Sequence, residues 1–463
     1  MNVQSAPSTQ ATIDKLRSAV RGRVVTPEAA DYDDLRAVAV PVDGRPAVIV
    51  RPADARDVAR AVSIASEAGL PIAVRSGGHS GAGHGVVDDG IVVDLRDMKA
   101  LEVDVEGRTA WAETGLTAGE YTTAVAAHGL ATGFGDTGSV GIGGITLGGG
   151  VGYLVRKHGR TIDSLLAAEV VTADGQVLQV DAQTHPDLFW AVRGGGGNFG
   201  VATRFQFRLH ELDAFVGGIL ILPATADVLA GFIAAAEAAP EELSTIANVM
   251  PCPPMPFVPA EHHGELIVMG MMAFAGSAED GERALAPFRA LATPIADMVR
   301  PSPYPDMYPP ADPDYHPTAV ARVFFLDHVD PDVAGRIVDT LADSDATMRV
   351  AQLRVLGGAM ARVPSDATAF AHRSSRIMAV VAAFYEGPDD RIVREEWVES
   401  FAGALRQGDP GAYVNFLGDE GQERVRAAYP GATWDRLAEI KRRYDPANLF
   451  RSTQNIPPNG GPA

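Results

Sequence analysis

A strand-like segment that runs directly into a glycine-rich loop constrains this chain most. Residues 71–84 read PIAVRSGGHSGAGH, with four glycines, two serines and two histidines. Because glycine has no side chain, consecutive backbone N–H groups of such a loop can turn toward one point and form a concave anion site. Arg75 adds positive charge at the start of the loop. We therefore predict a loop that binds phosphates, with His79 at its centre.

Two further glycine clusters follow. Residues 133–152 read GFGDTGSVGIGGITLGGGVG, and residues 193–200 read RGGGGNFG. Glycine at this density suits a backbone that lies close against a flat or phosphorylated ligand. Three clusters together predict one large, extended, phosphate-bearing cofactor. The alternative is that the glycines only form loops.

The third cluster satisfies G-x-G-x-x-G through Gly195, Gly197 and Gly200. A nicotinamide-binding fingerprint follows a strand and opens a helix, whereas residues 201–208 alternate like a strand after these glycines. This context disfavours a Rossmann site. The chain also lacks the P-loop motif G-x-x-x-x-G-K-[ST], which argues against a P-loop nucleotide site. It lacks G-x-S-x-G as well, which argues against the simplest type of hydrolase.

Composition excludes several other classes. The 463 residues are 46% apolar and carry a net charge of −20 without a basic run. We therefore predict a folded protein of two domains that binds neither nucleic acid nor an anionic membrane.

Cys252 is the only cysteine, so neither an intramolecular disulfide nor a multi-cysteine metal site is possible. The EHHGE segment at 261–265 lacks a zincin histidine pair, and we expect no metal. Residues 1–14 lack an apolar signal core and no transmembrane span follows, which predicts a cytoplasmic protein. We also expect no obligatory protein partner.

Local patterns predict a mixture of strands and helices in an α+β arrangement. A helix is expected from Asp54 to the stop signal at Gly69, and a hairpin is expected to turn at Asp174-Gly175. The predicted strands of the first half are 47–50, 72–74, 91–95, 109–113 and 201–208. From about residue 213 the glycine clusters disappear and Pro, Met and aromatic residues collect. In this part strands are predicted at 322–326, 348–355 and 377–385, with a helix at 332–342.

Four motifs in this order resemble the FAD-linked oxidases of the vanillyl-alcohol oxidase superfamily, which have a PCMH-type FAD-binding domain. They are RSGGHS at 75–80, VGIGG at 140–144 with GGG at 148–150, DLFWAVRGGGGNFG at 187–200, and YDPANLF at 444–450. The berberine-bridge-enzyme-like branch is the most similar, and bacterial hydroxynicotine oxidases share the pattern. The resemblance spans nearly the whole chain.

The resemblance implies a two-domain fold. An FAD-binding domain would comprise residues 1–212 and, after a return of the chain, residues 412–463. A middle domain, residues 213–411, would cover the flavin and bind substrate with an antiparallel sheet that helices cover.

The family also implies how the cofactor is held. Its histidine in RSGGH bonds covalently to a methyl carbon of the flavin, which assigns that link to His79. Thr137 stands where many members have a second, cysteinyl link, so FAD should be linked through His79 only. The other residues implied to bind FAD are Arg75, Ser76, Gly77, Gly78, Ser80, Thr137, Gly138, Val140, Gly141, Gly144, Gly148, Val201, Asn415 and Asn455.

Catalysis in such enzymes moves a hydride to the flavin while a base removes a proton from the adjoining O–H or N–H. Family members often place a Tyr-x-Asn-Tyr strand beside the flavin, and here it reads Tyr413-Val-Asn-Phe416. Phe416 can neither donate nor accept a proton, which leaves the base open. We assign Tyr413, Asn415 and Gln352 to catalysis and Arg354 and His372 to the substrate site.

The resemblance further implies that the residue at Val140 controls access of oxygen to the flavin, and valine favours access. The chain is thus expected to be an oxidase that transfers hydride from an alcohol, hemiacetal or amine carbon of a small molecule to FAD and reduces O2 to H2O2. The alternatives are a dehydrogenase with another electron acceptor, a flavin-binding protein without efficient catalysis, and an NADH-dependent reductase.

Overall fold

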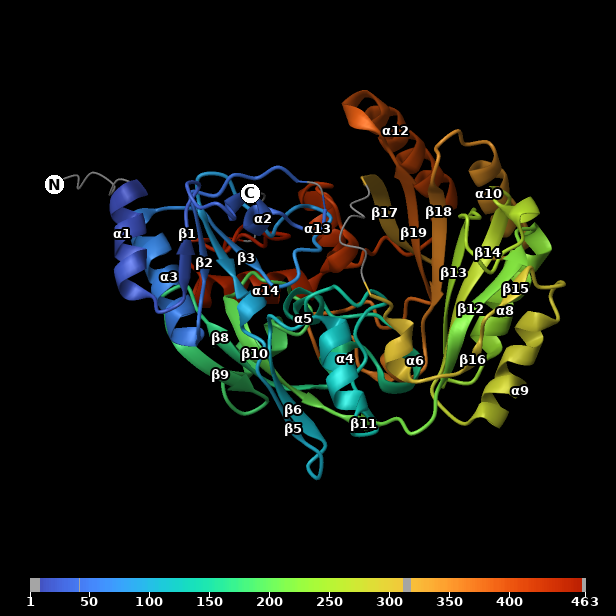
Figure 1. Cartoon of the computed structure of the whole chain (residues 1–463), viewed down its shortest axis with the longest axis horizontal. Coiled ribbons are helices and arrows are strands. Elements are labelled where there is room, and N and C mark those ends of the chain that lie inside the picture. The colour runs from blue at the N-terminus through green and yellow to red at the C-terminus, as the bar shows by residue number, and fades with distance from the viewer. Residues whose placement is uncertain (1–8, 41, 311–317, 460–463) are drawn as a thin grey trace.

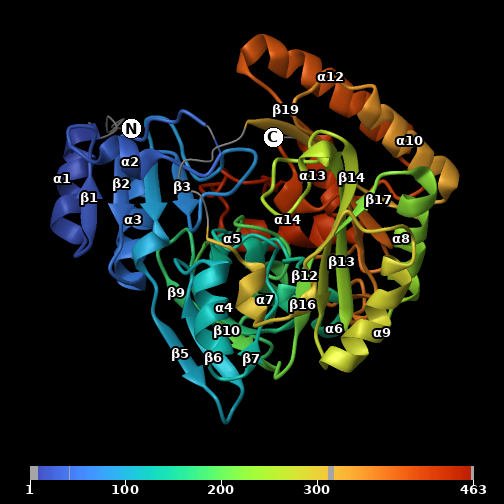
Figure 2. The same ribbon diagram turned by 45° about the vertical axis from the view of Figure 1, so that its right-hand side comes forward.

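The computed structural model describes residues 9–40, 42–310 and 318–459. Two lobes lie side by side (Figure 1): one carries the small sheets of the first half, and the other carries an eight-stranded sheet. Helices α13 (Gln422–Ala428) and α14 (Ala432–Tyr444), drawn in red, lie against the first lobe on the side toward the eight-stranded sheet (Figures 1 and 2). This arrangement is the predicted α+β fold with a middle antiparallel sheet.

A four-stranded sheet opens the first lobe, in the order β1-β2-β4-β3. Its strands are β1 (Arg23–Val25), β2 (Val48–Arg51), β3 (Ile72–Arg75) and β4 (Ile91–Asp94). Strand β3 runs parallel to β4, as β2 does, and it delivers the first glycine loop from its carboxyl end. Helices α1 (Thr9–Ala19) and α3 (Ala55–Ala68) pack on this sheet, and α2 (Tyr32–Arg36) lies beside it.

Helix α3 forms where the sequence predicts it. The Asp54 side chain accepts hydrogen bonds from two backbone N–H groups at its start, and Gly69 ends it with a left-handed φ of 65°. Helix α1 was missed, because the segment reads as polar; its Ile13 and Leu16, three residues apart, are buried against α3 and the sheet.

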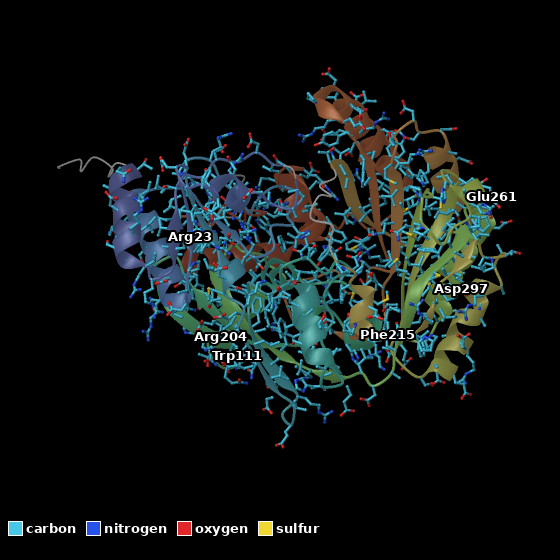
Figure 3. All side chains as sticks on the ribbon, in the orientation of Figure 1. Arg23, Trp111, Arg204, Phe215, Glu261 and Asp297 are labelled. Atoms are coloured by element: carbon cyan, nitrogen blue, oxygen red, sulfur yellow. The ribbon has the colours of Figure 1, made fainter. Side chains whose placement is uncertain are left out.

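A five-stranded antiparallel sheet follows, in the order β5-β6-β10-β8-β9. Its strands are β5 (Leu101–Asp104), β6 (Thr109–Glu113), β8 (Leu165–Val171), β9 (Val177–Asp181) and β10 (Val201–Arg208). The hairpin β8–β9 turns at Gly175, whose φ is 77°, and this confirms the predicted turn. The Arg204 guanidinium of β10 lies 4.6 Å from the ring centre of Trp111 on β6 (Figure 3).

Short helices connect these strands. They are α4 (Ala118–Ala126), α5 (Ile142–Leu147), α6 (Val155–His158) and α7 (Pro186–Ala191). A two-stranded sheet joins β7 (Leu130–Ala131) to β11 (His210–Glu211). Phe215, labelled in Figure 3, then marks the passage of the chain into the second lobe.

The second lobe is an antiparallel sheet in the order β15-β12-β14-β13-β18-β19-β17, with β16 paired to β12. Its strands are β12 (Val216–Pro223), β13 (Leu243–Pro251), β14 (Leu266–Phe274), β15 (Ala296–Asp297), β16 (Arg300–Pro301), β17 (Ala319–Leu326), β18 (Arg349–Val355) and β19 (Ile377–Phe384). The three strands predicted in this part correspond to β17, β18 and β19.

Helices cover one face of this sheet. They are α8 (Ala226–Ala238), α9 (Ala278–Arg289), α10 (Pro331–Ala342) and α12 (Gly387–Leu405). Strand β17 shows how the two faces divide: Phe324 packs into the core under the helices, whereas Val323 and Phe325 join the core of the first lobe. Alternation along the strand therefore lets the sheet close one side of the first lobe.

The segment after residue 411 returns to the first lobe. Helix α14 (Ala432–Tyr444) buries Trp434 and Leu437 in the same core as Phe205 of β10, and α13 (Gln422–Ala428) precedes it. Residues 413–416, predicted as a strand, instead form a 3₁₀ turn over Val414–Phe416. The turn pairs with no strand, so the prediction of a strand was wrong. No helix in the described ranges is long and apolar enough to cross a membrane.

Candidate active site

All three glycine clusters meet at one cavity of about 390 Å³ in the first lobe. Its wall combines the loop after β3, the segment leading into α5, the start of β10 and the C-terminal residues 413–416 and 450–454. The predicted cofactor residues that line it are Arg75, Ser76, Gly77, Gly78, His79, Ser80, Thr137, Val140, Gly141, Gly144, Val201 and Asn415. One shared cavity agrees with one large ligand.

The first two glycine clusters touch each other. A Cβ on Gly77 would lie 2.2 Å from the Gly141 backbone nitrogen, so only glycine permits this contact. The Ser76 hydroxyl accepts a hydrogen bond from the Gly143 N–H at 3.2 Å. The two loops are therefore held as one unit.

Gly144 plays a different part. It lies inside α5 and lines the cavity, and a Cβ at this position would meet no heavy atom within 4 Å. Such a Cβ would enter the open cavity. The helix thus presents bare backbone to the ligand, as a flat ring held at close range requires.

His79 is half-buried on the wall of the cavity. Burial lowers the pKa of its imidazole, and a hydrogen bond to the Ser139 backbone opposes that shift. An imidazole that is neutral and held by one nitrogen leaves the other nitrogen available as a nucleophile. His79 therefore fits the role of forming a covalent link.

Arg75 lines the cavity, and its guanidinium is already paired. Its Nη2 lies 2.8 Å from the Asp94 carboxylate, and its Nη1 donates to the backbone oxygens of Arg36 and Ala37 at 3.1 Å each. Both side chains of the pair are buried. Arg75 thus ties the 35–37 segment to β3 and shares its charge with Asp94, and its binding of the cofactor stays a prediction.

Three of the predicted cofactor residues, Gly138, Gly148 and Asn455, do not line the cavity. A Cβ on Gly148 would meet the Asn415 side chain at 1.9 Å, so this glycine admits Asn415 to the end of α5. Gly138 packs against Tyr308 instead. Asn455 is buried, and its Oδ1 has no hydrogen-bond partner in the described structure.

The two polar residues of the 413–416 segment are bonded to each other. The Tyr413 hydroxyl accepts hydrogen bonds from the Gly150 N–H at 3.0 Å and from Asn415 Nδ2 at 2.9 Å, and Asn415 Nδ2 also donates to the Ile145 carbonyl at 3.0 Å. Tyr413 is 1% exposed. Both residues line the cavity, as does Phe416.

The sheet of the second lobe contributes a chain of polar contacts at the rim. Arg354 Nη2 lies 2.5 Å from Asp136 Oδ2, and Gln352 Oε1 accepts from Arg354 Nε and Nη2 at 3.1 and 2.6 Å. Gln352 Nε2 in turn donates to Asn248 Oδ1 at 2.8 Å. Asp136 lines the cavity, whereas Gln352 and Arg354 reach it through Asp136 and through Phe416, whose ring centre is 5.1 Å from the guanidinium.

His372 is not brought to the site. Its Nε2 bonds to the Ala428 carbonyl at 3.1 Å, its ring lies 5.1 Å from that of Phe325, and burial lowers its pKa. It packs between the sheet and α13 and does not line the cavity. Its place in the substrate site stays a prediction, which the contacts of His372 do not support.

Among the lining residues that sequence reasoning missed, two are titratable. His84 lines the cavity with a buried Nε2 that has no hydrogen-bond partner, and burial lowers its pKa. Asp136 stands one residue before Thr137 in the second glycine cluster. Its position among glycines, beside a segment already assigned to the cofactor, was the available signal.

The wall of the cavity fits FAD. Gly144 leaves room for a flat ring, the loop after β3 offers backbone N–H groups, and the side chain of His84, whose buried Nε2 has no hydrogen-bond partner, lines the same space. The donor set contains no metal cluster: in the described ranges no three His, Cys, Asp or Glu side chains group as ligands.

Comparison with known proteins gives the family. Residues 46–181 match the FAD binding domain family, and residues 412–457 match the berberine and berberine-like family. The chain is 30% identical over 464 residues to the (R)-6-hydroxynicotine oxidase of Paenarthrobacter nicotinovorans, covering 95% of this chain and 98% of that enzyme. The chain belongs to the berberine-bridge-enzyme-like branch of the vanillyl-alcohol oxidase superfamily.

Other relatives agree with this assignment. The chain is 29% identical to the xylooligosaccharide oxidase of Thermothelomyces thermophilus, over 89% of this chain and 87% of the relative. The crystal structure of 6-hydroxy-D-nicotine oxidase from Arthrobacter nicotinovorans superimposes with a TM-score of 0.85 at 27% identity, covering 95% of this chain and 98% of that chain. As a member of this branch, the protein is an FAD-dependent oxidoreductase.

Proposed function

We propose that this berberine-bridge-enzyme-like protein oxidises an alcohol, hemiacetal or amine carbon of a small molecule, with O2 as the electron acceptor and H2O2 as the product. The observation that carries the proposal is one cavity that brings together His79, the bare backbone of the glycine clusters and Asp136, which contacts Arg354 of the second lobe. Relatives named for oxidation of 6-hydroxynicotine and of xylooligosaccharides support substrates of the amine and sugar classes.

FAD is held covalently through His79 alone in this proposal. When bound, FAD supplies the acceptor for a hydride. The loops around Gly77 and Gly141 surround it, and Thr137 offers no thiol for a second link. Cys252 is buried with Ile221, Val258 and Ile267 in a separate cluster of the second lobe.

Tyr413, Asn415 and Gln352 act in this proposal by holding other groups. The Tyr413 oxygen already accepts two N–H donors, and both polar atoms of the Gln352 amide are bonded. Arg354 and Gln352 do not line the cavity; they act on a substrate through Asp136, which Arg354 holds.

Val140 is proposed to admit oxygen to the flavin. It lines the cavity between Thr137 and Gly141. Val140→Ile adds a methylene at this point. We expect reoxidation of the reduced protein by O2 to slow by about tenfold or more, which corresponds to an increase of about 1.4 kcal/mol in the activation free energy. Stopped-flow reoxidation measures the effect, and anaerobic reduction by the same substrate is the internal control. Equal reoxidation rates would remove Val140 from this role.

The proposal is tested by mixing the flavin-loaded protein anaerobically with (R)-6-hydroxynicotine, xylobiose, glucose and benzyl alcohol, and then admitting air. An oxidase bleaches with one of them, recovers its colour at once in air and produces peroxide. Bleaching with slow recovery in air would instead support the dehydrogenase. Absence of bleaching by every probe would support a flavin-binding protein, and bleaching by NADH alone a reductase.

The domain boundaries at 212/213 and 411/412 also remain our proposal, as does the cytoplasmic location. The boundaries are supported by the start of the eight-stranded sheet at Val216 and by the 3₁₀ turn at Val414, with which the chain rejoins the cavity.

A further inference from the structure

Removal of a proton from the substrate requires an acceptor at the cavity, and Phe416 cannot serve. Among the cavity-lining residues in the described part of the chain, the titratable side chains are Arg75, His79, His84, Asp136 and Tyr413. Asp136 is the only carboxylate in this set. It is therefore the first group to examine.

Three of the other four are already committed. Arg75 is paired with Asp94 and bonded to backbone carbonyls. His79 is assigned to the flavin link. The Tyr413 hydroxyl oxygen accepts from Gly150 and Asn415, so it could take a substrate proton only by giving up one of these hydrogen bonds.

Asp136 has one oxygen held and one oxygen available. Its Oδ2 lies 2.5 Å from Arg354 Nη2, whereas its Oδ1 has a single contact at 3.4 Å from the Thr137 hydroxyl, beyond an ordinary O–H···O distance. The Asp136 side chain is 24% exposed. Through Arg354 of β18 it links a loop of the first lobe to the sheet of the second lobe. His84 also has an unused nitrogen, but no contact ties it to the sheet of the second lobe.

Arg354 is itself fixed. Its Nε and Nη2 donate to Gln352 Oε1, Gln352 donates to Asn248, and Asn248 Nδ2 donates to the Met269 carbonyl at 3.2 Å. This chain of hydrogen bonds crosses β18, β13 and β14. A guanidinium held in this way keeps the carboxylate in one orientation.

We propose that the Asp136 carboxylate accepts the substrate O–H or N–H proton and that Arg354 is its positioning residue. This inference rests on the proposed function. The proton passes to Asp136 Oδ1, the electron pair of the O–H or N–H bond forms the C=O or C=N bond, and the C–H electron pair leaves with its hydrogen as a hydride that the FAD accepts. One substrate is oxidised by two electrons and one flavin is reduced by two.

The test measures the rate of anaerobic flavin reduction in the flavin-loaded protein, with the fastest of the four probes named above. Asp136→Asn keeps the shape and a hydrogen bond to Arg354 but has no charge to accept a proton, and should slow reduction by about 10²–10⁴-fold. The matched control is Asp163→Asn: Asp163 forms a similar ion pair with Arg373, at 2.7 and 2.8 Å, but does not line the cavity. This control should change the melting temperature and leave the reduction rate within a few fold.

Arg354 is tested by its pH profile. The groups that face Asp136 are Arg354 from β18, the Tyr153 hydroxyl, which bonds to the Asp136 backbone oxygen at 3.3 Å, and the neighbouring Tyr308. Arg354→Met should displace the pH dependence of reduction and slow it on the order of 10²-fold, and Arg354→Lys should restore part of the rate. A merely structural role would lower stability without moving the pH profile.

The outcomes separate the two proposals. If no probe reduces the wild-type flavin, the proposed function fails and this inference fails with it. If the wild type is reduced and Asp136→Asn is reduced equally fast, the proposed function stands and Asp136 is not the acceptor. A loss of reduction in His84→Gln but not in Asp136→Asn would overturn the inference in favour of His84.

Discussion

At the scale of single residues, glycine positions distinguish packing from ligand space. Gly77 is required because its Cβ would strike the backbone of Gly141. Gly144 is different, since its Cβ would meet only the open cavity. The same residue type therefore builds the wall in one place and leaves room for the cofactor in the other.

Gly144→Ala tests this distinction. Alanine favours a helix interior by about 1 kcal/mol over glycine, so the stability of the flavin-free protein should hold or rise, while the fraction of protein that carries flavin should fall severalfold. The 450 nm to 280 nm absorbance ratio and thermal melting measure the two effects. Gly403→Ala in α12, where a Cβ also meets nothing, is the control and should raise stability without changing flavin content. Full flavin content in Gly144→Ala would contradict the proposed position of the ring.

Most of the residues predicted to bind FAD line the cavity, because glycine clusters and His79 are local signals. Sequence reasoning did not find contacts whose two partners lie far apart along the chain. No residue near Arg75 in the sequence predicts its ion pair with Asp94, and no residue near His372 predicts its hydrogen bond to Ala428. Asp136 escaped notice for the same reason, because Arg354 stands 218 positions later.

At the scale of elements, one buried lysine holds the C-terminal segment in place. Lys441 Nζ lies 2.7 Å from Asp445 and donates to the carbonyls of Asn198 and Phe450 at 2.8 and 2.9 Å. Burial lowers the pKa of Lys441, and Asp445 opposes the shift. The contact joins α14 to the third glycine cluster and positions residues 452–454 on the cavity wall.

Lys441→Met removes this contact and leaves the Asp445 carboxylate buried without its cation. We expect a loss of about 3–5 kcal/mol of unfolding free energy, together with lower flavin content. Chemical denaturation measures the first quantity and absorbance the second. Arg442→Met on the exposed side of α14 is the control, and its effect should stay within about 0.5 kcal/mol. Equal stability of the two variants would show that Lys441 does not hold the segment.

Elements with a regular spacing of apolar residues were predicted well, because α3, β8–β9 and β17 to β19 show this pattern in their own sequences. The error at 413–416 has a tertiary cause: Tyr413 and Asn415 bond to residues around α5, and this favours a turn over an extended strand. Helix α1 was missed because only two of its apolar residues mark the buried face.

At the scale of the whole molecule, the two lobes meet through charged side chains that are buried with partners. Arg373 spans them to Asp163, and Arg156 of α6 donates to the carbonyls of Leu356 and Ala239 at 2.9 Å each. Within the first lobe, Asp94 joins Arg75 and Arg96. Such pairs make stability depend on pH.

Asp94 gives the clearest expectation for acid. Burial raises its pKa, but Arg96 and Arg75 outweigh burial, and the net shift is downward from 3.8. A carboxyl with a lowered pKa in the folded state stabilises the protein above the pKa of the unfolded chain and loses that contribution as the pH falls toward the folded value. The melting temperature should therefore fall steeply below about pH 4. Asp94→Asn should cost about 3–5 kcal/mol at neutral pH and melt with a flatter dependence on acid. An unchanged acid slope in Asp94→Asn would refute this account.

Acid precipitation shows whether FAD is bonded covalently to His79. Purified wild-type protein and His79→Ala are precipitated with acid, and the visible spectra of pellet and supernatant are compared. We expect the yellow colour to stay with the wild-type pellet and to pass to the supernatant in His79→Ala. Release of the flavin from the wild type, or retention of it by the His79→Ala pellet, would contradict a single histidyl link.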